Sequence, residues 1–149
     1  MKKYFLIILL LNVAIFAKAQ AAKDSIIATI NKFFAGIKNA DTALLKASLT
    51  NTALLQTVRN NAGKISVENE QISGFIDFVS KQKTGDADEQ IKIETVISDG
   101  ALATVWTPYQ FYYKGKFSHC GVNSFQLVRI DGKWKIQYII DTRKREGCQ

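Results

Sequence analysis

The chain has 149 residues, of which 47% are hydrophobic and 22% charged, and its formal net charge is +7. These values are ordinary for one globular domain, and the lack of Pro-rich, Ser-rich or repeated segments argues against a disordered or solenoid protein. Much of the positive charge lies between residues 100 and 149. Because basic residues on strand edges are usually solvated, we expect no nucleic acid among the partners.

Residues 1–19 have the three parts of a secretory signal peptide. Two lysines precede an apolar run, residues 4–16, and small residues follow at positions 17 and 19. The run is shorter than the ~20 residues that a membrane-spanning helix needs. We therefore predict cleavage before Gln20, a processed domain of residues 20–149 in the periplasm or outside the cell, and no stable membrane insertion. An uncleaved membrane anchor is the alternative.

Three helices are expected at the start of the domain. Apolar residues recur at spacings of three and four over residues 26–37, after Asp24 or Ser25, either of which can cap a helix. A short second helix should begin at Asp41, and a third helix should follow Asn69. Each would present one apolar face to a common core.

Strands are expected between and after these helices. Residues 53–59 and 64–67 flank an Asn- and Gly-containing turn and predict a β-hairpin. From Ile91 the apolar period becomes two, and three Gly-containing turns at residues 99–100, 114–116 and 131–132 divide the remaining chain into four strands. The sequence thus predicts a long antiparallel meander.

Two-residue turns fix the register of the last strands. A tight turn at Asp131-Gly132 pairs Phe125 with Tyr138 and Asn123 with Ile140. A similarly tight turn at Lys114-Gly115-Lys116 extends the same apolar face into the preceding strand, with Tyr109 beside Gly121. The residues expected on this face are Thr107, Tyr109, Phe111, His119, Asn123 and Tyr138. The opposite, mixed face is expected to hold Trp106, Val122, Ser124 and Ile139.

This order of elements predicts an α+β fold in which a curved, mostly antiparallel sheet wraps around three N-terminal helices as an open cone. The segments 103–106, 117–122, 125–128, 134–136 and 141–143 resemble the nuclear-transport-factor-2-like (NTF2-like, or SnoaL-like) superfamily, and within it a bacterial group described as putative lumazine-binding. The resemblance implies the cone fold and often a homodimer. Related families include isomerases, dehydratases and pure binding proteins, so the fold does not choose a function.

His119 is the only histidine and the leading candidate for chemistry. A histidine pKa lies near neutrality, so the side chain could act as a general acid or base, contact a ligand, or serve only the structure. Asp141 would complete an acid–base pair, but the simple register turns it to the mixed face unless a β-bulge re-aims it. His119 and Asp141 are therefore the candidate catalytic residues.

The aromatic side chains of the inner face suit a planar organic molecule, although such residues also pack as core. We expect a pocket of at least ~300 Å³ at the mouth of the cone. The candidate ligand-binding residues are Tyr109, Phe111, His119, Asn123 and Tyr138. The leading function is small-molecule binding. The alternatives are an isomerase, dehydratase or hydrolase that uses His119 for proton transfer, and a structural dimer without catalysis.

No cofactor is expected, and one histidine with two distant cysteines offers no evident metal site. On the mixed face, Trp106, Val122, Ser124 and Ile139 would form an exposed apolar strip, through which we predict a homodimer.

Two cysteines in an exported chain favour a disulfide, here between Cys120 and Cys148. The tail must turn back for this bridge to close, and Gly147 permits such a turn because it has no Cβ. Two free thiols are the alternative.

Overall fold

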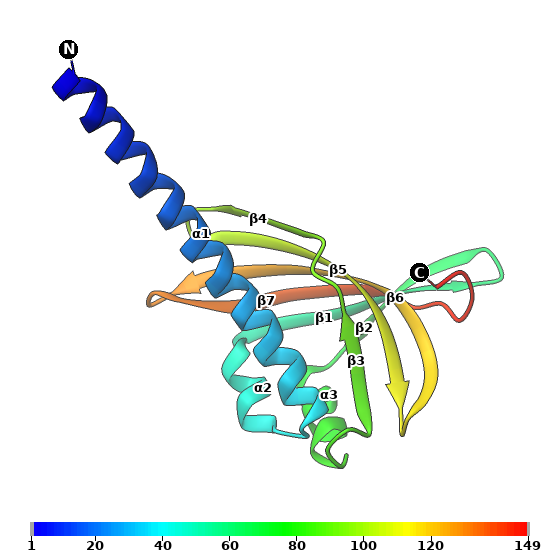
Figure 1. Cartoon of the computed structure of the whole chain (residues 1–149). Coiled ribbons are helices and arrows are strands. Elements are labelled where there is room, and N and C mark those ends of the chain that lie inside the picture. The colour runs from blue at the N-terminus through cyan, green and yellow to red at the C-terminus, as the bar shows by residue number, and fades with distance from the viewer. Residues whose placement is uncertain (1, 149) are drawn as a thin grey trace.

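The computed structural model describes residues 2–148, with side chains described from Gln20 onward. In chain order, two helices are followed by a hairpin, a third helix and a long run of strands (Figure 1). The helices are α1 (Lys2–Lys38), α2 (Thr42–Ser48) and α3 (Ile72–Ser80). The strands are β1 (Leu49–Asn61), β2 (Lys64–Glu70), β3 (Ala87–Ile91), β4 (Thr95–Asp99), β5 (Leu102–Tyr113), β6 (Lys116–Ile130) and β7 (Lys133–Thr142).

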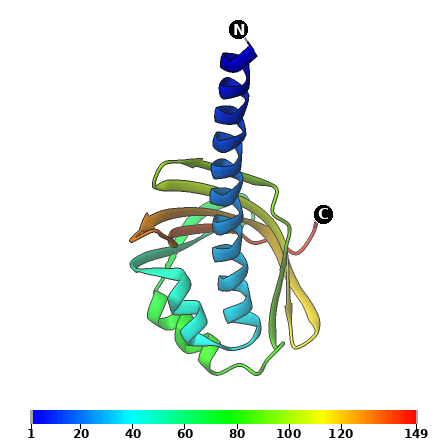
Figure 2. The same ribbon diagram turned by 60° about the vertical axis from the view of Figure 1, so that its left-hand side comes forward.

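The strands form one open, curved sheet in the order β2-β1-β7-β6-β5-β3, and β4 also pairs with β5. β1 and β7 run parallel, and the other pairs of these strands are antiparallel. Figure 2 shows the sheet curving around α1, with α2 and α3 beside the lower half of that helix. The α+β cone expected from the sequence is confirmed.

α1 is one continuous helix, so the predicted start near Asp24 is not a helix end. The Ser25 hydroxyl donates instead to the Ala22 carbonyl within the helix. Neither Pro nor Gly occurs before Gly36, so no residue of the segment breaks the helix. The side chains of residues 1–19, the predicted signal peptide, lie outside the described part. Within the described residues, no helix combines the length and apolar character needed to cross a membrane.

The core lies between α1 and the inner face of the sheet. Phe125 of β6 is fully buried. Its ring packs edge-to-face with Phe33 and Phe34 of α1, with ring centroids 6.0 and 5.9 Å apart. α2 begins after Asp41, whose carboxylate accepts a hydrogen bond from the Leu44 amide, as predicted. The ring contacts of Phe125 hold α1 against the sheet.

The β5–β6 register is the predicted one up to Phe111, after which it shifts by one residue before the turn. Tyr109 pairs with Gly121 and Phe111 with His119 across the hairpin. The next hairpin departs from expectation after its first residues: Leu127 pairs with Ile136, but Phe125 then pairs with Ile139 rather than with Tyr138. A β-bulge has inserted one residue into β7.

Gln137 is the extra residue of this bulge, and its side chain explains why the bulge is stable. Its Oε1 accepts hydrogen bonds from the hydroxyls of Thr50 (2.9 Å) and Thr52 (3.3 Å), and its Nε2 donates to the Thr52 carbonyl at 3.0 Å. The pairing of β1 with β7 shifts over the same stretch, between Leu49 and Leu54. The glutamine thus joins two irregular strand segments.

The bulge reverses the predicted faces of the end of β7, because a one-residue slip turns each side chain to the other side. Ile139 is 6% exposed and packs in the core, so its predicted place in an outer dimer strip is wrong. Tyr138 lies on the outer face, where its hydroxyl donates to Gln56, and it does not line the cavity. Asp141 turns inward opposite Asn123.

The structure joins Cys120 to Cys148, the pair expected from the sequence, with their Cα atoms 5.8 Å apart. Cys120 and Lys144 also exchange two backbone hydrogen bonds of 2.9 Å each. Gly147 has a φ of +63°, the left-handed conformation that lets the tail turn back. The bridge and the backbone bonds together hold residues 144–148 on β6.

The bulge predicts that truncating two neighbouring residues has very different effects on the free energy of unfolding. Ile139→Ala should lower the free energy of unfolding by about 2–4 kcal/mol because it empties core volume, whereas Ile140→Ala on the outer face should cost less than about 1 kcal/mol. Urea denaturation of both variants measures this difference. A larger cost for Ile140→Ala would contradict the bulged register.

Candidate functional site

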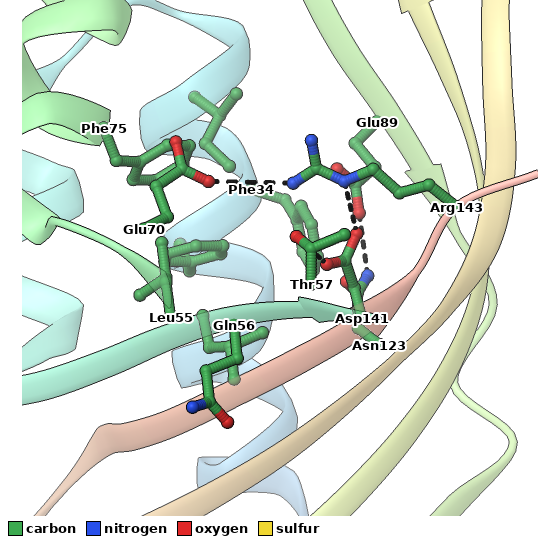
Figure 3. Close-up of a pocket in the computed structure, with 13 residues that line it drawn as sticks. Phe34, Leu55, Gln56, Thr57, Glu70, Phe75, Glu89, Asn123, Asp141 and Arg143 are labelled. Carbon is green, nitrogen blue, oxygen red and sulfur yellow. Dashed lines mark hydrogen bonds and ion pairs between the residues drawn. The ribbon is translucent and has the colours of Figure 1, made fainter. Parts of the chain in front are cut away.

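The candidate site is a cavity at the open end of the cone, between the inner face of the sheet and helices α1 and α3 (Figure 3). It has two adjoining parts, of about 220 and about 60 Å³. The larger part is smaller than the expected 300 Å³, which favours a compact ligand. The residues that line both parts are Ile37, Glu70, Phe75, Glu89, Asp141 and Arg143.

Asp141 is the anchor of the polar side chains in this cavity. It is 8% exposed. One carboxylate oxygen accepts from the Thr57 hydroxyl at 2.5 Å, and the other accepts from the Tyr109 hydroxyl at 3.1 Å and from Arg143 Nε at 2.7 Å. Because three donors already occupy this carboxylate, it holds its neighbours in place and is poorly available as a base.

Tyr109 can approach Asp141 because a glycine faces it on β6. A Cβ atom on Gly121 would lie 1.8 Å from the Thr142 carbonyl oxygen and 3.0 Å from the Tyr109 ring. That carbonyl also lies 2.9 Å from the Tyr109 hydroxyl and is its second acceptor. Burial, with the charges of Asp141 and Glu89, raises the pKa of Tyr109, so the phenol stays protonated and remains a donor.

Glu89 of β3 is the second carboxyl group of the cavity and has a different environment. Its Oε1 accepts a hydrogen bond of 2.7 Å from Asn123 Nδ2, and its Oε2 makes no hydrogen bond to any described residue. Burial raises the pKa of Glu89 from 4.5 to about 7, against the lowering effect of the Asn123 hydrogen bond. Glu89 therefore exchanges a proton near neutral pH and has an oxygen free for a ligand.

Arg143 follows β7 and crosses the cavity between two acids, as Figure 3 shows. Its Nε donates to Asp141, and its Nη2 lies 3.7 Å from Glu70 Oε2. Burial acts to lower the pKa of Arg143, but Asp141, Tyr109 and Glu70 together outweigh this effect and raise it, so the guanidinium stays charged. Its place depends on the segment that the Cys120–Cys148 bridge fastens to the sheet.

His119 lines the larger part of the cavity. The centroid of its ring lies 5.0 Å from that of Phe111 and 5.7 Å from that of Tyr109. Its Nδ1 is 3.0 Å from the Ser118 hydroxyl. Burial and the nearby Arg143 lower the pKa of His119, which favours the neutral ring at pH 7. No hydrogen bond joins it to Asp141 among the described residues, so the predicted acid–base pair is not assembled.

The predicted ligand residues divide between the two parts. Tyr109, Phe111 and His119 line the larger one and Asn123 the smaller one. Sequence reasoning missed Glu89 because the strand was expected to begin at Ile91. Within the described part of the chain, no three His, Cys, Asp or Glu side chains gather as a metal ion would require.

The sequence around Glu89 gives little sign of an inward carboxylate. Asp88, Glu89 and Gln90 are three polar residues in a row, and of the five residues of β3 only Ala87 is buried. A carboxylate at an inward position of such a strand is costly unless it is paired, and this marks it as a residue with a role.

Comparisons with known proteins agree with the fold. Residues 21–138 match the sequence pattern of a family described as putative lumazine-binding. An NTF2-like protein with a cystatin-like fold from Novosphingobium aromaticivorans DSM superposes with a TM-score of 0.71 at 14% identity, over 93% of this chain and 91% of its own. An NTF2-like protein of unknown function from Shewanella baltica OS155 gives 0.66 at 16% identity, over 85% and 96%. No curated protein matches the chain.

The raised pKa of Glu89 predicts a pH-dependent stability. Between its ordinary pKa of 4.5 and about 7, the folded protein binds more protons at this site than the unfolded chain, so stability falls as pH rises. This loss should reach at most about 3 kcal/mol above pH 7 and should vanish in Glu89→Gln. Urea denaturation across this pH range measures it, with the exposed Glu94→Gln as control. Parallel curves for wild type and Glu89→Gln would contradict the assignment.

Proposed function

Because the chain belongs to the family described as putative lumazine-binding, we propose that its domain binds one compact, planar organic molecule in the cavity of the cone. The observation that carries this proposal is the combination of aromatic walls with a polar network that is already in place. Ligand sites typically join apolar walls to a few fixed polar groups that orient the ligand.

The walls and the polar groups occupy different sides of the cavity. Rings from α1, α3, β5 and β6 supply flat apolar surface. Glu89, Asn123 and Arg143 supply acceptors and donors whose positions are fixed by their hydrogen bonds. Side chains that are fixed before binding lose little conformational entropy when a ligand arrives, and this favours affinity.

Two observations favour binding over a reaction catalysed by the predicted His119–Asp141 pair. Asp141 has three donors, and the two side chains share no hydrogen bond. If the bound molecule is also converted, Glu89 is the group suited to move a proton, because its pKa of about 7 lies near working pH. Recovery of the bound molecule in altered form would favour that second candidate.

We also propose export, with removal of residues 1–19. The three-part leader supports it, and the family match begins at residue 21, directly after the predicted cleavage. The Cys120–Cys148 bridge is also compatible with an oxidising compartment, where such bonds persist.

Native mass spectrometry tests the binding proposal. Protein purified from its own host should carry one small organic molecule, and His119→Trp should lose it because the larger ring fills the cavity. Gln126→Trp, on the exposed outer side of β6, is the matched control and should retain it. The proposal fails if wild-type protein carries no molecule and binds neither lumazine nor any other one- or two-ring compound in an NMR screen.

We further propose a homodimer through the outer face of the sheet. Trp106 is 45% exposed there and lies opposite Ser124, near Val122, while Ile140 takes the place expected for Ile139. Sedimentation velocity should show a dimer at micromolar concentration, and Trp106→Lys should give a monomer because a buried charge opposes association. Ile65→Lys, far away on the β1–β2 hairpin, should leave the dimer intact. A monomeric wild type, or a dimeric Trp106→Lys, would refute this interface.

A further inference from the structure

We propose that the cavity selects a cationic ring, such as an amidine or a protonated nitrogen heterocycle, over a neutral or anionic ring of the same shape, with Glu89 as the group that receives it. This inference rests on the proposed function and names the chemical class of its ligand.

The charge of the lining is the first argument. Three acids, Glu70, Glu89 and Asp141, line the cavity, and Arg143 is the one Lys or Arg residue among the lining residues of its two parts. Arg143 is already paired with Asp141 at 2.7 Å and lies 3.7 Å from Glu70. An anion would therefore compete with two carboxylates for this guanidinium, whereas a cation meets an excess of negative charge.

The free oxygen of Glu89 is the second argument. Asn123 holds one oxygen of this carboxyl group, which fixes its orientation on β3 and leaves the other oxygen without a partner among the described residues. A carboxylate in this state accepts a charge-assisted hydrogen bond, which is about twice as strong as a neutral one. An N–H group that carries positive charge supplies the matching donor.

The rings beside Glu89 are the third argument. Phe111 pairs with Glu89 across β3 and β5, and Phe75, Tyr109 and His119 line the same larger part of the cavity. A cation is attracted to the faces of aromatic rings, by about 2 kcal/mol or more where water is excluded. The neutral state of His119 avoids repulsion of such a ligand.

The charged groups around Glu89 define how binding depends on pH. Asp141 and Arg143 act on it from β7 and the segment that follows, with opposite signs. Lys38 of α1 is paired with the neighbouring Asp88 at 3.0 Å. With a pKa of about 7, Glu89 is about nine-tenths ionised at pH 8 and about one-tenth ionised at pH 6. Affinity for a permanent cation should fall about tenfold over that interval.

NMR titration of the purified protein with benzamidine, benzamide and benzoate tests the inference. These probes share a ring and differ in charge. At pH 8 benzamidine should bind at least about tenfold more tightly than benzoate and should shift the resonances of Tyr109 and Phe111. Its affinity should fall about tenfold by pH 6 as Glu89 takes up a proton. Glu89→Gln should lose both the preference and the pH dependence, while Glu94→Gln, outside the cavity, should keep them.

The possible failures are distinguishable. Equal or tighter binding of benzamide or benzoate overturns the inference and leaves the proposed function standing. Cation preference that survives in Glu89→Gln overturns the role of Glu89, provided that near-UV circular dichroism shows this variant to be folded. A missing pH dependence in the wild type overturns that role without any variant. If none of the probes binds at millimolar concentration and no molecule is retained, the proposed function fails as well.

Discussion

The bulge at Gln137 is the constraint on which the rest of the structure depends. Without the extra residue, the end of β7 would present Ile140 and Thr142 to the interior and Asp141 to the outside. The buried hydroxyl of Tyr109 and the guanidinium of Arg143 would then lack their common acceptor. A buried polar group without a partner costs about 1–3 kcal/mol, and more when it is charged. The hydrogen bonds of one half-buried amide side chain therefore govern the polarity of the interior.

Asp141 and Glu89, two of the three acids that line the cavity, differ through their partners rather than through their chemistry. Asp141 is surrounded by three donors, which stabilise its charge and leave little capacity for a further contact. Glu89 is half-buried, and desolvation destabilises its charge more than the hydrogen bond from Asn123 stabilises it; its second oxygen has no partner among the described residues. Asp141 therefore holds its neighbours in place, whereas Glu89 can change its protonation state and contact a ligand.

Much of this fold was accessible from the sequence because it is encoded by local signals. Two-residue turns such as Asp131-Gly132, with φ of +49° and +75°, set their hairpins, and the apolar spacing of residues 26–37 marked the buried side of α1. The β5–β6 turn is of the same kind, but a register shift between Phe111 and Tyr112 separates it from the predicted pairing of Phe111 with His119. The pairing of Cys120 with Cys148 needed only an even count of cysteines and a glycine next to the second one.

The remainder could not be predicted because it depends on contacts between distant strands. The bulge at Gln137 is stabilised by Thr50 and Thr52, more than eighty positions away in the chain, and no local pattern indicates it. Every misplaced residue of β7, Ile139 and Tyr138 among them, follows from that one slip. Glu89 was missed for another reason: its strand begins directly after a loop, where alternation is too short to be noticed.

The fastening of the C-terminal segment also bears on how long a bound molecule stays. Arg143 lines both parts of the cavity, and the residues after it are held by two backbone hydrogen bonds and by the bridge to Cys120. Chain ends usually open locally at little cost in free energy, and each opening offers an escape route. A covalent link closes that route without touching the ligand. For the proposed ligand, reduction of the bridge should therefore act mainly by raising the dissociation rate.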